Sequence, residues 1–141
     1  MADALATVLT YDSAADYTTN IGQAAYVSDA GIVTLSSAST AQGSGVPGII
    51  VDVLSTTEVS ICVHGRCQAR VGDDFDVGTT TGWAMAAADG RLDPYAILTD
   101  TVFGSQNVAI GFFTGAGNQD LANADRAEFF VSPQLRPDSQ T

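Results

Sequence analysis

Apolar residues along the chain fall into short runs that are bounded by Gly, Asp or Pro. Within segments such as 58–61 and 107–110, every second residue is a large apolar one. A period of two residues, interrupted by frequent turn residues, is typical of β-strands. From Gly22 onward the pattern therefore predicts an all-β fold.

The runs occur twice, in segments 22–71 and 72–117. Landmark residues of the two segments lie 47 to 51 positions apart: Gly22 and Gly72, Gly31 and Gly82, Pro47 and Pro94, Asp52 and Asp100, Ile61 and Ile110. This spacing indicates a pseudo-repeat of a hairpin, a Pro-led strand and a further strand. One copy is too small to bury its own apolar face. We expect the two copies to pack into one β-domain, 22–117, as a small antiparallel β-barrel or sandwich.

Residues 1–21 lack the Gly-bounded pattern and predict an extended N-terminal arm outside the β-domain. An extended arm can add a strand to an exposed sheet edge of another protein, with alternate side chains entering pockets. The apolar positions that would make this contact are Leu5, Val8, Leu9 and Tyr11.

The C-terminal part, 118–141, predicts a short helix over 118–127, then a strand and a tail that begins at Pro133. Phe129, Phe130 and Val131 form an apolar run in that strand. An exposed edge of this composition would aggregate unless another subunit covered it. These three residues are therefore candidate subunit contacts.

Charge narrows the classes of partner. Sixteen acidic residues, fourteen of them Asp, face five Arg and no Lys, which gives a net charge of −11. Such a chain repels phosphate backbones and anionic lipid, so we expect neither nucleic acid nor a membrane as partner. Composition bias alone explains Arg in place of Lys, but not so many acids. Adaptation to concentrated salt, in which carboxylates are screened, explains both and is the favoured interpretation.

Cys62, His64 and Cys67 are the densest reactive cluster. Zinc needs four ligands and the chain has no other Cys or His, so no metal site is expected. If His64 and Gly65 form a two-residue hairpin turn, the two Cys face each other closely enough for a disulfide. The alternative is a pair of free, buried thiols in a continuous strand.

Motifs for cation binding, nucleophilic catalysis and phosphate binding are absent from the sequence or incomplete. The acidic run 72–76 lacks the ligand spacing of a calcium hand, and acidic residues at a strand start explain it better than a surface Ca²⁺ or Na⁺. The chain has no Gly-x-Ser-x-Gly motif and no Lys-led phosphate loop. We expect no catalytic residues, no cofactor and no enzymatic activity.

The motif order in 72–112 is a Gly-Asp-x-Phe start, a Gly-containing turn, a small-residue strand, Pro-x-x-Ile-Leu-x-Asp and Val-x-Ile. This order resembles that of the capsid decoration (cement) proteins of tailed viruses, and segment 22–63 shows a weaker resemblance to the same proteins. These motifs consist of turn glycines and strand hydrophobes, and the family has no catalytic residues to carry over.

The resemblance implies a structural protein on the outer surface of an icosahedral capsid. Its partners would be the major capsid protein and further copies of itself, often in a trimer. No positively charged region precedes an apolar run at the N-terminus, so synthesis in the host cytoplasm without a signal peptide is expected. The acidity suggests a virus of a halophilic archaeon. The alternatives are a tail-tube or spike-base subunit, and a carbohydrate-binding or hydrolytic β-domain.

Overall fold

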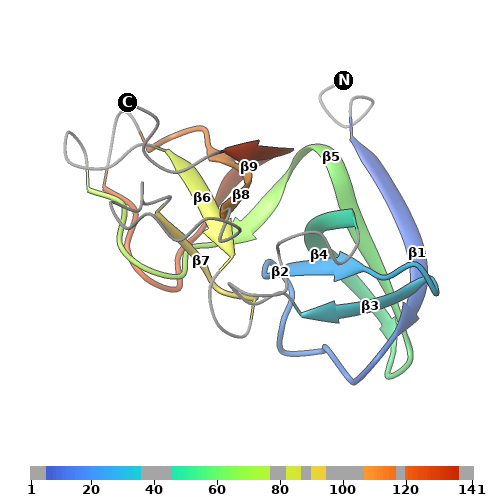
Figure 1. Ribbon diagram of the computed structural model, residues 1–141. Coiled ribbons are helices and arrows are strands. Elements are labelled where there is room, and N and C mark those ends of the chain that lie inside the picture. The colour runs from blue at the N-terminus through green and yellow to red at the C-terminus, as the bar shows by residue number, and fades with distance from the viewer. Residues whose placement is uncertain are drawn as a thin grey trace.

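A computed structural model describes residues 6–35, 46–76, 82–86, 90–94, 107–116 and 120–136 (Figure 1). These residues contain strands, turns and bridges and no α-helix, so the predicted all-β class is confirmed. The strands are β1 (Thr7–Ser13), β2 (Ala24–Val27), β3 (Ile32–Leu35), β4 (Val46–Ser55), β5 (Glu58–Arg70), β6 (Trp83–Ala86), β7 (Leu92–Pro94), β8 (Asn107–Phe113) and β9 (Arg126–Arg136).

The first five strands close into a small barrel in the order β1, β3, β2, β4, β5 and back to β1. β1 closes it by pairing antiparallel with β5 and, at Asp12 and Ser13, parallel with β3. Alternate residues fill the interior. The fully buried members are Ala25, Val33, Ile50, Val59 and Ile61. Tyr17, from the loop after β1, is also buried against this cluster.

β5 connects the barrel to a second sheet. Its first half pairs with β1 and β4, and residues 65–70 pair with β9, followed by β8, β6 and β7. The strand leaves the barrel wall in a marked bend (Figure 1). Gly65 lies at this bend with φ +95°, a conformation that a residue with a Cβ rarely adopts.

A second apolar core lies between the barrel wall and the second sheet. Ala24, Ile49 and Cys62 contribute from the outside of the barrel. The second sheet and its loops contribute an aromatic series in which Phe75 contacts Phe113 at 5.1 Å between ring centroids. Phe113 in turn contacts Phe129 at 4.8 Å. This core holds the two units together.

The predicted N-terminal arm is partly wrong. Thr7–Ser13 belongs to the barrel, because strands β2 to β5 leave an opening between β3 and β5 that β1 fills. Tyr11 is half-buried against the interior cluster, whereas Val8 and Leu9 are exposed. Leu5 lies outside the described residues.

The C-terminal predictions also need correction. Residues 120–127 form turns and the start of β9, not a helix, because Leu121 exchanges two backbone hydrogen bonds with Phe75 (2.8 and 2.9 Å). Phe129 and Val131 are fully buried, since β9 lies between β5 and β8 and is not an edge strand. Phe130, on the opposite face, is half-buried.

The two pseudo-repeats lie mostly in different units, although the second half of β5 belongs to the second sheet, and their corresponding strands pair differently. Segment 22–71 supplies β2 to β5, and segment 72–117 supplies β6 to β8. In the first segment β2 is the central strand, between β3 and β4. In the second, the central strand is β6, which corresponds to β3 of the first segment and lies between β7 and β8.

Candidate functional site

The two cysteines lie side by side in one strand, so of the two alternatives the continuous strand with free thiols is found and the hairpin is wrong. β5 runs without interruption from Glu58 to Arg70, so no turn occurs at His64 and Gly65. The bend at Gly65 brings the thiols together instead. Both thiols are free, and Cys62 Sγ donates to the His64 carbonyl at 3.3 Å. Hydrogen bonding to Cys62, followed by burial, raises the pKa of the Cys67 thiol, so it is neutral at pH 7.

His64 does not complete a metal site with these thiols. Its exposed side chain packs edge-on against the Phe130 ring, with 5.7 Å between the ring centroids. In the described ranges, no group of three or more His, Cys, Asp or Glu could hold a metal ion. Asp74, in the acidic run, instead accepts a hydrogen bond from the Asn123 backbone at 2.8 Å.

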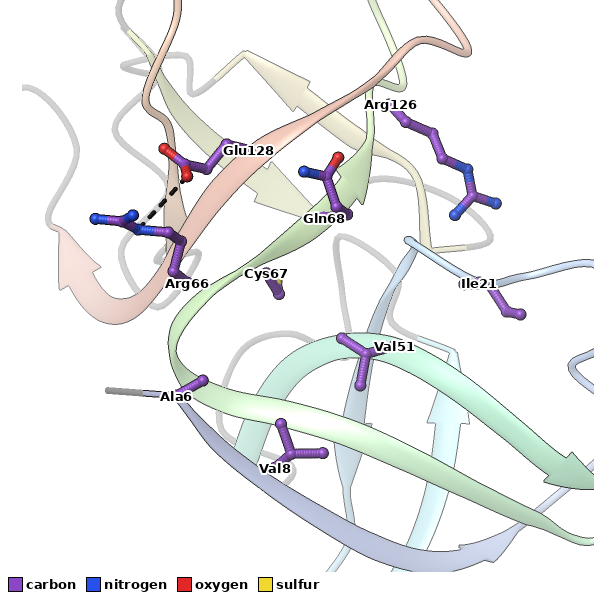
Figure 2. A pocket seen from close by; sticks show the side chains of 9 residues that line it. All are labelled: Ala6, Val8, Ile21, Val51, Arg66, Cys67, Gln68, Arg126 and Glu128. Atoms are coloured by element: carbon purple, nitrogen blue, oxygen red, sulfur yellow. Dashed lines mark ion pairs between the residues drawn. The ribbon is translucent and has the colours of Figure 1, made fainter. Parts of the chain in front are cut away.

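A groove of about 760 Å³ follows β5 just beyond the bend (Figure 2). One side is apolar and the other is polar. The apolar side consists of Ala6, Val8, Ile21, Val51 and Cys67. The polar side consists of Arg66, Gln68, Arg126 and Glu128. The barrel wall and the second sheet therefore both contribute to this surface.

The polar side contains three charged side chains, of which, among the described residues, Arg66 and Glu128 form an ion pair and Arg126 does not. Arg66 Nε lies 3.5 Å from Glu128 Oε2, with both side chains almost half exposed. Arg126 projects from the start of β9 toward Ile21 (Figure 2). Arg126 makes no ion pair or side-chain hydrogen bond within the described part of the chain. The groove thus presents a free guanidinium on a protein with a net charge of −11.

The structure brings few of the predicted site residues together. Val8 and Cys67 both line the groove, whereas Leu9 does not. Phe129 and Val131 lie in the core. Arg66 and Arg126, the two arginines that line the groove, were missed; the only signal in the sequence was the rarity of basic residues, five Arg in the whole chain.

The fold defines a small closed β-barrel that shares its longest strand with a second antiparallel sheet. A scan against protein-family models finds no match, and no curated protein matches the sequence. The described residues include no helix with the length and apolar character needed to cross a membrane.

Proposed function

We propose that the protein is a non-enzymatic structural virion protein that binds the outer surface of an icosahedral capsid and stabilises it. The observation that carries the proposal is the position of the exposed apolar side chains. In the described residues, all the large hydrophobic side chains that are well exposed belong to the barrel: Val8, Leu9, Ile32, Val46 and Leu54, at 39 to 53% exposure. A partner protein that covers the barrel would remove these five side chains from water.

The motif order in 72–112 supports the same proposal, because it resembles that of capsid decoration proteins. The partners are then the major capsid protein and further copies of the chain, in a trimer. The Lys-free, acidic composition fits a virion that is exposed to concentrated salt, such as that of a virus of a halophilic archaeon.

The test is to locate the protein on virus particles. Antibodies raised against the recombinant protein are applied to intact particles purified from cultures that carry the sequence, and the label is imaged by electron microscopy. We expect label over the whole capsid surface without prior opening of the particles. Label confined to the tail would favour a tail-tube or spike-base subunit, and absence from purified particles would refute a virion role.

The contribution of the barrel surface is tested with the double variant Val46→Asp/Leu54→Asp, in which two exposed side chains become charged. It should fold normally and no longer bind particles from which the protein has been stripped. Thr56→Asp, in the exposed turn between β4 and β5, adds a charge outside this apolar set and is the control.

A further inference from the structure

Within the part of the chain that the structure describes, the second half of β5 has one edge without a partner strand. Residues 65–70 pair with β9 along one edge. On the other edge, the pairing with β1 ends at His64, and the Arg70 backbone N–H donates to the Gly22 carbonyl at 2.9 Å. Between these two points, no strand of the described chain pairs with this edge.

The direction of the free backbone groups follows from the ladder. In an antiparallel ladder, successive residues point their N–H and C=O groups to opposite edges. Arg70 points its N–H away from β9, so Gln68 and Arg66 also point theirs away. Side chains from both faces of the strand, Gln68 on one and Cys67 on the other, line the groove at this edge. The groove is therefore the space beside an open strand edge.

The two faces at this edge differ in chemistry. On the face toward the barrel, Cys67 and Val51 pack against the buried core, and Val8 is 48% exposed. On the other face, residues 66, 68 and 70 lie opposite residues 130, 128 and 126 of β9. An added strand, whose side chains alternate between the faces, would meet an apolar surface with one set and a polar surface with the other.

Two arginines, Arg70 and Arg126, occupy opposite positions of β5 and β9 on the polar face. Arg70 and Arg126 are direct cross-strand partners, and because the Arg70 N–H goes to Gly22 they form a non-hydrogen-bonded pair, in which side chains approach most closely. Like charges at such positions are destabilising. Within the described residues, neither side chain has an ion pair or hydrogen bond. A carboxylate placed here would relieve the repulsion.

We propose that this groove binds an extended segment of a partner protein, in which acidic and apolar residues alternate, as an added strand along the 65–69 edge of β5. Backbone hydrogen bonds to Arg66 and Gln68 fix its register. Its apolar side chains cover Val8 and Val51, and its carboxylates lie over Arg126 and Arg70. The proposal concerns the groove alone and goes beyond capsid attachment.

The probe is a fluorescently labelled, end-capped peptide of about eight residues in which Asp and Val alternate, long enough to span the open edge at about 3.3 Å per residue. Binding is followed by fluorescence anisotropy. We expect Arg70→Gln/Arg126→Gln to weaken binding by about tenfold or more, since two charge-assisted contacts are lost.

Arg91→Gln is the matched control, because Arg91 is an exposed Arg whose ion-pair partner, Asp93, lies in β7 and not in the groove. It should change the affinity by less than about twofold. Hydrogen exchange of the full-length protein should show slower exchange at the Arg66 and Gln68 amides when the peptide is bound.

Several results would overturn the proposal. They are equal affinity for a peptide with Lys in place of Asp, unchanged affinity of the double variant, and no binding of the Asp-Val peptide. Two further results would identify a different occupant and overturn it as well. In the first, the Arg66 and Gln68 amides already exchange slowly in the absence of peptide, and this protection is lost when residues 1–5 are removed. In the second, the oligomer mass changes in the Arg70→Gln/Arg126→Gln variant, which would identify a second copy of the chain as the occupant. None of these results affects the particle-labelling test.

Discussion

Substitution of Phe129 tests whether this residue belongs to the core, as the structure places it, or is a subunit contact, as the sequence predicts. It is fully buried in β9, and its ring packs edge-to-face against Phe113 at 4.8 Å between centroids. The sequence alone places it on an exposed edge beside Phe130. The two neighbours point to opposite faces of the sheet, so paired alanine substitutions measure the two environments separately.

The magnitude follows from burial. Phe129→Ala removes a ring from a close-packed core and leaves a cavity, at a cost of about 3–5 kcal/mol. For a chain of this length the loss corresponds to a fall in Tm of about 10–20 °C. Phe130 is half-buried and contacts His64 and Phe112 with ring centroids 5.7 and 5.6 Å away. Phe130→Ala should cost about 1–2 kcal/mol.

Urea unfolding is the assay, followed by fluorescence of Trp83, the single Trp, which lies in the second sheet against Phe112. Circular dichroism provides a second probe of the whole fold. Phe129→Ala should lower the midpoint much more than Phe130→Ala, with similar slopes. The reasoning would be refuted if Phe129→Ala lowered the oligomer mass while the free energy of unfolding stayed within about 1 kcal/mol of wild type.

Three further predictions concern the rest of the molecule. Removal of residues 1–13 should prevent cooperative unfolding of the barrel, measured by circular dichroism, because β3 and β5 lose the strand that joins them; a normal transition would show that β1 is dispensable. Iodoacetamide should modify both thiols in unreduced, denatured protein but react slowly with Cys67 in folded protein at pH 8, because its pKa is raised; a linked peptide containing Cys62 and Cys67 would show a disulfide instead. Tm should rise from about 0.1 M to above 1 M salt as carboxylate repulsion is screened; a flat or falling Tm would exclude salt adaptation.

The all-β class could be predicted from the sequence because it depends on local patterns. Positions such as Val59 and Ile61 alternate with polar residues, and both are fully buried in the barrel. Glycine also marked the turns: Gly22 and Gly31 have positive φ, which their sequence context as turn residues predicts.

The errors arise where long-range pairing decides the structure. Leu121 has helix-compatible neighbours, but its backbone pairs with Phe75, which is 46 residues earlier. Residues 7–13 lack the Gly-bounded strand pattern and were therefore predicted to be an arm, yet their backbone closes the barrel. Neither partner can be read from local periodicity, because strand pairing depends on which edges the rest of the fold leaves open.

The candidate groove could not be predicted for a related reason. Its residues come from β1 and the residue before it, from β4, β5 and β9, and from the loop before β2, and the bend of β5 brings them together. A hairpin at Gly65 would have paired the two halves of β5 with each other and left no open edge. Because the strand continues instead, its first half closes the barrel and its second half starts the other sheet. The same bend brings the two thiols together and leaves the edge at Arg66 and Gln68 without a strand partner in the described chain. Gly65 thus shapes the groove through the backbone of β5, although it is not one of the residues that line it.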